Sequence, residues 1–181
     1  YKRQILGMNP SEKVKYISNW IKSYVDQMPS KAKSLVVGIS GGIDSSVSST
    51  LSAMTGLKTI VLSMPIKQIE KQHDLSLKHQ KWLVENFKNV EAHTINLDEL
   101  FKAFSLTLNK FENEHGFANS GARLRMATLY QVAAANDGIV VGTGNKVEDF
   151  GVGFYTKYGD GGVDISPIAD CNKSEVWELG K

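Results

Sequence analysis

The stretch Val37-Gly38-Ile39-Ser40-Gly41-Gly42-Ile43-Asp44-Ser45-Ser46 joins a short apolar run to a helix-like segment from Val47 to Met54. Its glycines let the backbone approach a ligand closely. The first N–H groups of the following helix, together with the positive end of its dipole, attract an anion. A β-branched run, a loop of glycines and hydroxyls and then a helix therefore predict a loop that binds the phosphates of a nucleotide.

This loop differs from two well-known phosphate loops. A Walker A loop needs a Lys after its last glycine, and no Lys follows Gly42. The dinucleotide pattern G-x-G-x-x-G is also absent, because Gly38, Gly41 and Gly42 have a different spacing. Ser-Gly-Gly-x-Asp-Ser instead resembles the pyrophosphate loop of N-type ATP pyrophosphatases, which implies attack on the α-phosphate of ATP and release of pyrophosphate. The alternative is a plain Ser/Gly turn with Asp44 as a helix cap.

Composition restricts the classes of partner. The 181 residues suffice for one domain with a sizeable core, and the shares of hydrophobic residues (41%) and charged residues (22%) are typical of soluble globular proteins. The net charge of +2 arises from interleaved Lys and Glu, so we expect no nucleic-acid partner. No apolar run approaches the ~18 residues of a membrane span, so we expect no membrane partner. A single cysteine, Cys171, excludes an internal disulfide and fits a reducing compartment, so we expect a cytoplasmic protein.

Both ends of the chain look cut. The sequence begins at Tyr1 without a Met, and it stops at Lys181 inside a helix-like pattern that starts at Lys173. We expect one domain over residues 1–181 that is truncated at its C-terminus.

Apolar runs alternate with helix-like segments along the chain. Strands are predicted at 35–39, 59–64, 90–97 and 138–142, and helices at 10–28, 47–54, 67–87, 98–108 and 122–135. The third strand is less apolar and so nearer an edge, and the polar segment 109–120 is predicted to be a mobile surface segment. The alternation predicts a three-layer α/β fold, in which helices flank a mostly parallel sheet and ligands bind beyond the carboxyl ends of the strands.

Acidic and hydroxyl residues follow two of these predicted strands. Asp44 comes after the first strand, and Glu148 comes after the fourth. If the two strands are neighbours, both carboxylates face one crevice and could hold Mg²⁺ against ATP phosphates. Spacing alone favours a solvated loop acid for Glu148. Thr143 could either reach the nucleotide with its hydroxyl or cap the turn.

Two arginines and a glycine-rich stretch are further candidates for binding. Arg123 and Arg125 stand two residues apart in a predicted helix, so at most one points at a given ligand. We expect Arg123, nearer the helix start, to contact an anion and Arg125 to be a surface charge. Residues 154–162 combine glycines, aromatics and a Lys, and we expect a lid or binding loop, with a plain surface loop as the alternative.

Histidine and cysteine offer little chemistry. None of the four histidines has the spacing of a metal ligand, and we expect them to be structural or solvated. Cys171 has no His nearby in the sequence, so we expect an ordinary buried side chain.

Several stretches together resemble one family, the ammonia-dependent NAD synthetases. The narrowest motif is Thr156-Lys157-Tyr158-Gly159-Asp160-Gly161. The other matching stretches are residues 38–45, 122–126 with Leu129-Tyr130, 142–148, 153–165, and Pro167-Ile168 followed by Lys173. The resemblance covers nearly all of the chain and is weakest between residues 67 and 120. It implies a fold like that of the adenine nucleotide alpha hydrolases, which is Rossmann-like.

The resemblance also implies a reaction and its residues. Deamido-NAD (nicotinic acid adenine dinucleotide) would be amidated by ammonia through an acyl adenylate, giving NAD, AMP and pyrophosphate in the last step of NAD biosynthesis. The residues that would bind ATP are Gly38, Ile39, Ser40, Gly41, Gly42, Ile43, Asp44, Ser45, Thr143 and Lys173. Asp44 and Glu148 would bind Mg²⁺, and Arg123, Lys157 and Asp164 would contact deamido-NAD. No side chain is expected to act as nucleophile or base, and a homodimer is expected.

The chain departs from the family in two respects. Members of the family continue beyond the position of Lys181, and the stretch between Glu148 and Thr156 is about one residue longer here than in some of them. Residues 1–181 include no glutaminase domain, which favours free ammonia as the nitrogen donor, with glutamine through a separate domain as the alternative.

Other functions share the same loop. GMP synthetase would lack the stretch 156–160, and a tRNA-modifying thiolase should show paired cysteines and a basic face. A non-catalytic nucleotide-binding sensor is a third alternative, against which the presence of Asp44 and Glu148 argues.

Overall fold

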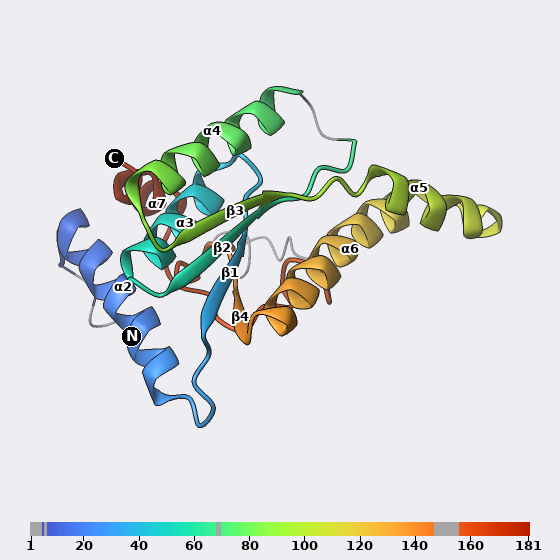
Figure 1. Cartoon of the computed structure of the whole chain (residues 1–181). Coiled ribbons are helices and arrows are strands. Elements are labelled where there is room, and N and C mark those ends of the chain that lie inside the picture. The colour runs from blue at the N-terminus through green and yellow to red at the C-terminus, as the bar shows by residue number, and fades with distance from the viewer. Residues whose placement is uncertain (1–4, 6, 68–69, 147–155) are drawn as a thin grey trace.

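A parallel sheet forms the centre of the molecule in the computed structural model, which describes residue 5 and residues 7–67, 70–146 and 156–181. The strands are β1 (Ser34–Gly38), β2 (Lys58–Ser63), β3 (Val90–Thr94) and β4 (Gly138–Val141). Their order in the sheet is β3-β2-β1-β4, and every neighbouring pair is parallel (Figure 1). The predicted parallel sheet is confirmed, and β3, the least apolar strand, lies at an edge.

Successive residues of β1 pack into different layers. Val36 pairs with Ile60 of β2 and Val140 of β4, and these three side chains belong to one core cluster. Leu35 and Val37 belong to the cluster on the other face. All three β1 side chains are fully buried, so the continuous apolar run follows from a strand that is covered on both faces.

Helices cover both faces of the sheet (Figure 1). One face carries α2 (Pro10–Gln27), α3 (Ile43–Met54), α4 (Glu70–Asn86) and α7 (Lys173–Leu179). The other face carries α6 (Glu114–Ala135), which is joined by α5 (Asp98–Thr107) and the short 3₁₀ helix η1 (Asn109–Phe111). This three-layer arrangement is the predicted α/β architecture, with the Rossmann-like fold.

Capping boxes begin two of the helices. Asn9 and Glu12 form a capping box, in which the N–H of Glu12 donates to Asn9 Oδ1 and the N–H of Asn9 donates to the Glu12 carboxylate, both at 2.9 Å. Asn172 and Glu175 form a second capping box at the start of α7, so the helix-like pattern near the end of the sequence is a helix.

The prediction of a mobile surface segment at 109–120 is wrong for most of its length. Helix α6 begins at Glu114, and its N-cap Asn113 accepts from the N–H of Gly116 at 2.7 Å. The Phe117 ring packs edge-on against the rings of Phe101 and Phe104 of α5. This contact stabilises the first two turns of α6, where Gly116 and Asn119 have poor intrinsic helix propensity.

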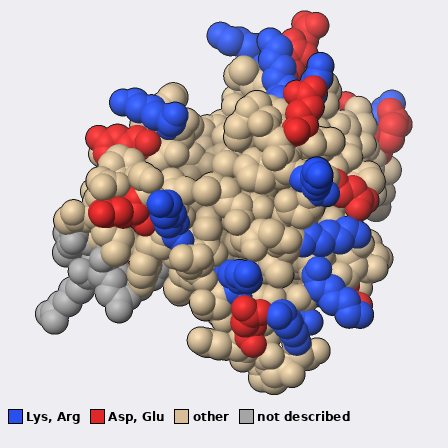
Figure 2. Space-filling model, turned by 60° about the vertical axis from the view of Figure 1, so that its left-hand side comes forward, with Lys and Arg blue, Asp and Glu red and all other residues tan. Residues whose placement is uncertain are grey.

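The surface shows no single dominant charge on the face drawn in Figure 2, where basic and acidic side chains are interspersed. Within the described residues, no helix combines the length and the apolar character needed to cross a bilayer.

Candidate active site

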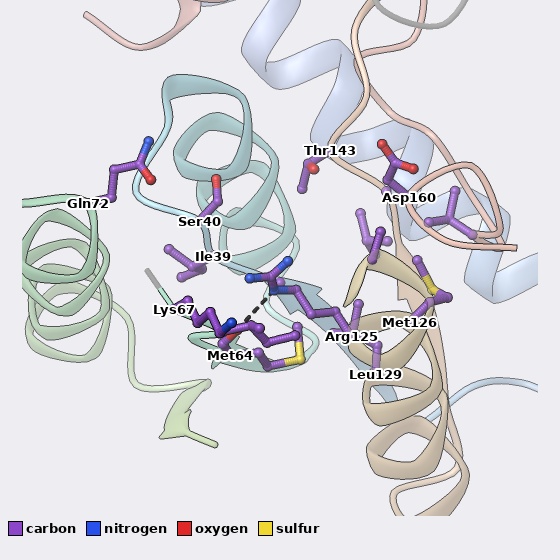
Figure 3. Close-up of a pocket in the computed structure, with 16 residues that line it drawn as sticks. Ile39, Ser40, Met64, Lys67, Gln72, Arg125, Met126, Leu129, Thr143 and Asp160 are labelled. Atoms are coloured by element: carbon purple, nitrogen blue, oxygen red, sulfur yellow. Dashed lines mark hydrogen bonds between the residues drawn. The ribbon is translucent and has the colours of Figure 1, made fainter. Parts of the chain in front are cut away.

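A cavity of about 500 Å³ opens at the carboxyl ends of β1, β2 and β4. Residues 38–40 line it at and after the end of β1, residues 141–143 at and after the end of β4, and Met64 after β2. Arg125, Met126 and Leu129 of α6 form one wall (Figure 3). The chain leaves β1 toward β2 on one side, whereas β4 lies on the other side. Such a switch point in strand order is where ligands bind in open α/β sheets. The cavity therefore lies where the fold favours a ligand site.

The glycine loop is held in shape by its own serines. The N–H of Ser40 donates to Ser45 Oγ at 3.2 Å, and the Ser45 hydroxyl donates to the carbonyl of Gly42 at 3.0 Å. Gly41 has φ +89°, and a Cβ at this position would lie 2.4 Å from the carbonyl oxygen of Gln72. Glycine is therefore required at position 41 by backbone conformation and by the close approach of α4.

Helix α3 starts at this loop without a side-chain cap. Gly42 stands at the N-cap, and within the described residues no side-chain cap bond reaches the first turn. Asn9 and Asn113, by contrast, cap α2 and α6 with their side chains. The first N–H groups of α3 and the positive end of its dipole are thus oriented toward the loop, as an anion site requires.

Asp44, in the first turn of α3, receives two partners from distant parts of the chain. Asn145, which follows β4 and is fully buried, donates its Nδ2 to Asp44 Oδ1 at 3.2 Å. Lys173 of α7 forms an ion pair with the other carboxylate oxygen. The structure therefore brings together two predicted ATP residues, Asp44 and Lys173. Sequence reasoning gave Asn145 no role, because only the fold brings a residue 101 positions away to this carboxylate.

The carboxylate of Asp44 suits a cation. Its side chain is 16% exposed beside the glycine loop, and a cationic group, Lys173 Nζ, already contacts it. Mg²⁺ typically binds to one or two carboxylates, with phosphate and water oxygens as the remaining ligands. Among the described residues, no three His, Cys, Asp or Glu side chains gather into a metal cluster. β1 and β4 are neighbours, as the predicted Asp44 and Glu148 pair requires, but Glu148 itself lies outside the described residues.

The two arginines of α6 have different environments. Arg125 is partly buried, lines the cavity and donates its Nε to the carbonyl of Met64 at 2.9 Å. Burial lowers the pKa of its guanidinium. The prediction that Arg125 is a surface charge is therefore wrong, because this face of α6, and not its outer face, closes the cavity.

Arg123 is exposed and contacts a second predicted residue. Its Nε donates to the backbone carbonyl of Lys157 at 3.0 Å. The turn around Lys157 is also fixed by Thr156, whose hydroxyl donates to Asn119 Oδ1 at 2.9 Å and whose N–H donates to Asp160 Oδ1 at 2.6 Å. The structure thus places the Arg123 side chain against the backbone of Lys157 at the surface, while Lys157 Nζ lies over the ring of Tyr158.

Asp164, the third residue predicted to contact deamido-NAD, is fixed by β4 and α6. Its Oδ2 accepts from the N–H of Val140 at 2.8 Å, and its Oδ1 accepts from the hydroxyl of Tyr130 at 3.0 Å. Burial, followed by the hydrogen bond to Asp164 and its charge, raises the pKa of Tyr130 to about 12. Tyr130 lies in a stretch that resembles the family, but the sequence assigned it no role, because its contact with Asp164 depends on the fold.

The single thiol lies away from solvent. Cys171 is fully buried, and burial followed by the charge of Glu175 raises its pKa to about 11. An ordinary buried side chain was predicted here, and the structure confirms it.

These features define a class of protein. A parallel sheet of order β3-β2-β1-β4, with an uncapped glycine loop after β1 and a cavity at the switch point, is a nucleotide-binding α/β domain. A family model described as NAD synthase matches residues 13–181, and the chain belongs to this family.

Curated relatives agree with this assignment. The chain is 41% identical over 184 residues to an NH(3)-dependent NAD(+) synthetase of Saccharolobus solfataricus, which covers 100% of this chain and 63% of the relative. It is 36% identical to the enzyme of the same name from Carboxydothermus hydrogenoformans, with 97% of this chain and 71% of the relative covered. The chain thus spans less than two thirds of the length of the Saccharolobus relative.

Solved structures share the fold. An NMN synthetase from Francisella tularensis matches with a TM-score of 0.87 at 36% identity, over 96% of this chain and 70% of that one. An NH3-dependent NAD synthetase from Campylobacter jejuni, in complex with the nitrate ion, matches with a TM-score of 0.84 at 30% identity, over 95% of this chain and 72% of that one.

Proposed function

We propose that this protein is an ammonia-dependent NAD synthetase, a carbon–nitrogen ligase that uses ATP to amidate deamido-NAD. The observation that carries this proposal is the meeting of the uncapped glycine loop, Asp44 and Lys173 beside the cavity at the switch point. Membership of the NAD synthase family supports the same reaction.

ATP would extend from the loop into the cavity. The backbone N–H groups of the loop and of the first turn of α3 would bind the β- and γ-phosphates, which leave as pyrophosphate. Thr143 lies on the cavity wall, where its hydroxyl can donate to the nucleotide. The apolar side chains of Met64, Met126 and Leu129 would hold the adenosine. This placement leaves the α-phosphate between the loop and the apolar end of the cavity.

The reaction would proceed in two steps. A carboxylate oxygen of the nicotinate ring forms a bond to the α-phosphorus of ATP as the bond to pyrophosphate breaks. Ammonia then adds to the acyl carbon, the bond from this carbon to the AMP oxygen breaks, and the nitrogen loses a proton to form the amide. No step needs a side-chain nucleophile, so the protein acts by positioning two nucleotides and by neutralising phosphate charge.

Asp44 and Glu148 would hold Mg²⁺ at this site. The bound ion would supply positive charge next to the phosphates of ATP. Two contacts of the Asp44 carboxylate support this role. Asn145 orients one of its oxygens, and the contact of Lys173 with the other oxygen shows that this carboxylate accepts a positively charged partner.

Deamido-NAD would bind beside Arg123, Lys157 and Asp164, whose sequence neighbours Ala122, Asp160 and Val163 line the cavity. Arg123, whose side chain contacts the backbone of Lys157, and Lys157 itself each provide a positive charge, and Asp164 provides a fixed acceptor. Two cations and one acceptor suit the two phosphates and a ribose hydroxyl of a dinucleotide.

The assembly and the location belong to the same proposal. We infer that residues 1–181 form one ATP pyrophosphatase-type domain and that two copies associate as a homodimer through α5 and η1, where Leu100, Leu106 and Phe111 are 50%, 64% and 78% exposed. Large exposed apolar side chains on neighbouring elements are typical of an interface. The single free cysteine supports a reducing compartment such as the cytoplasm.

The test is pyrophosphate release from ATP in the presence of Mg²⁺ and ammonium, with and without deamido-NAD. We expect release only with deamido-NAD, and we expect Asp44→Asn to abolish it. Asp74→Asn removes an exposed carboxylate from α4 and serves as the matched control. Circular dichroism of each variant checks that the fold is intact.

A second acceptor must be compared because one structural relative is an NMN synthetase. Nicotinic acid mononucleotide is therefore assayed beside deamido-NAD. A higher kcat/KM with the mononucleotide would replace the proposed substrate and keep the ligase chemistry. Release with xanthosine monophosphate or tRNA alone would contradict the proposal.

A further inference from the structure

Arg125 of α6 is one of the charged residues that line this cavity, and its side chain ends with the guanidinium group among the lining residues (Figure 3). In Figure 3 this group lies between the hydroxyl-bearing Ser40 and Thr143 on one side and Met64 and Leu129 on the other. One nitrogen, Nε, is bonded to the carbonyl of Met64 at 2.9 Å. This bond fixes the orientation of the guanidinium plane, and the two terminal nitrogens remain as further donors.

The charge of Arg125 needs a counter-charge. The side chain is partly buried, and the burial lowers its pKa. Within the described ranges, Arg125 forms no ion pair with a carboxylate. Among the described residues that line the cavity, Asp160 is the one acid, and its carboxylate already accepts from the N–H of Thr156. A partly desolvated cation of this kind favours an anionic ligand.

The remaining charges of the cavity point to the same ligand chemistry. Lys67 also lines the cavity, so the described lining residues include two basic side chains, Lys67 and Arg125, and one acidic side chain, Asp160. The terminal phosphates of ATP are expected on the loop and the adenosine against the apolar wall. The phosphoryl group that joins these two parts then lies next to Arg125.

Resting on the proposed ATP site, we propose that Arg125 binds the α-phosphoryl group of the nucleotide, the group at which the reaction takes place. The guanidinium donates to a phosphate oxygen and adds positive charge where the negative charge increases during attack. Because Nε is held by Met64, the donors are oriented before the nucleotide arrives.

The experiment compares the binding of adenosine, AMP and Mg-ATP to the wild type and to three variants by isothermal titration calorimetry. Arg125→Gln removes the charge and keeps an N–H donor that can reach the Met64 carbonyl, whereas Arg125→Lys keeps the charge. Lys81→Gln, at a side chain that is 77% exposed on α4, is the matched loss of one positive charge. Thermal unfolding of each variant reports on the fold.

We expect Arg125→Gln to weaken AMP and ATP binding about 10- to 100-fold and to leave adenosine binding unchanged, because a hydrogen bond to a charged group is lost. Arg125→Lys should recover part of the affinity for AMP, and Lys81→Gln should bind all three ligands like the wild type.

Two results would contradict the proposed role of Arg125 and leave the proposed function standing. The first is wild-type affinity of Arg125→Gln for AMP. The second is an equal loss for adenosine and AMP, which would assign the residue to the shape of the cavity. Failure of the wild-type protein to bind ATP would instead contradict the proposed function itself.

Discussion

The hydroxyl of Tyr130 connects α6 to one of the residues proposed to bind deamido-NAD. It can donate to Asp164 Oδ1 at 3.0 Å or to the carbonyl of Gly162 at 2.9 Å, and with a pKa raised to about 12 by burial and by Asp164 it stays protonated at neutral pH. Tyr130→Phe should destabilise the protein by ~0.5–1.5 kcal/mol, the net value of one hydrogen bond. The KM for deamido-NAD should rise about three- to tenfold, equivalent to ~0.7–1.4 kcal/mol. Steady-state kinetics and urea unfolding measure the two effects.

The control for Tyr130→Phe is the KM for the other substrate, ATP. Tyr130 lies on the Asp164 side of α6, so the KM for ATP should not change. An equal increase in both KM values would show that the variant perturbs the whole site. It would contradict a positioning role of Tyr130 toward Asp164.

The residues of the loop could be predicted from their motif, but the partners of single side chains could not. Spacing correctly separated Arg123 and Arg125 onto different faces of α6. It placed the wrong one at the surface, because which face of a helix meets a cavity depends on how the helix packs on the sheet. Asn145 was missed for a related reason: its contact with Asp44 exists only because β4 lies beside β1.

At the scale of elements, the glycine loop depends on its contact with α4. Gly41→Ala would combine a φ of +89° with a Cβ only 2.4 Å from the backbone oxygen of Gln72, so the loop would have to move. We expect a loss of more than ~2 kcal/mol in the free energy of unfolding. We also expect ATP to bind at least about tenfold more weakly, because the displaced loop loses N–H donors to the phosphates. Urea unfolding and calorimetry measure the two quantities.

Gly56→Ala is the matched control for the loop. Gly56 also has a positive φ, +77°, but a Cβ there would meet nothing within 4 Å. It should cost ~1–2 kcal/mol from the backbone conformation alone and leave ATP affinity unchanged. The same loss of ATP affinity in both variants would show that the close approach of α4 to Gly41 does not cause the loss.

The packing of α3 against α4 should depend on pH. His79 Nε2 lies 2.9 Å from Ser49 Oγ, and burial lowers the pKa of the ring from its usual 6.5. Because the unfolded chain takes up this proton more readily, the free energy of unfolding should fall as the pH falls below 6.5 and through the folded-state pKa. Urea unfolding at several pH values should show this slope in the wild type and a smaller one in His79→Gln. An equal dependence of the free energy of unfolding on pH in both proteins would contradict the attribution of this dependence to His79.

Helix boundaries show where local sequence is not sufficient. The start of α2 was predicted correctly because its capping box is encoded within four neighbouring residues, Asn9 to Glu12. The start of α6 was missed because Gly116 and Asn119 disfavour a helix locally. The aromatic contacts of Phe117 with α5, which compensate for them, are contacts between elements.

At the scale of the whole molecule, the alternation of strands and helices was enough to predict the layers. A parallel strand that is buried on both faces needs consecutive apolar side chains, and β1 (Leu35 to Val37) and β2 (Ile60 to Leu62) show this run at their centres. The pairing of β1 with both β2 and β4 could not be read from the run of residues, because hydrogen-bonding neighbours are chosen by the crossovers. The functional cavity follows from this pairing.

The proposed homodimer gives the last prediction. α5 and η1 extend away from the sheet in Figure 1, and they carry Leu106 and Phe111 at 64% and 78% exposure. Sedimentation equilibrium should give twice the mass of one chain for the wild type. The double variant Leu106→Asp and Phe111→Asp should be a monomer, because two charges would be buried without partners at the interface. Val84→Asp, at a 48% exposed apolar residue of α4, should stay dimeric. A dimer that survives the double variant would place the interface on another surface, and a wild-type monomer would contradict association altogether.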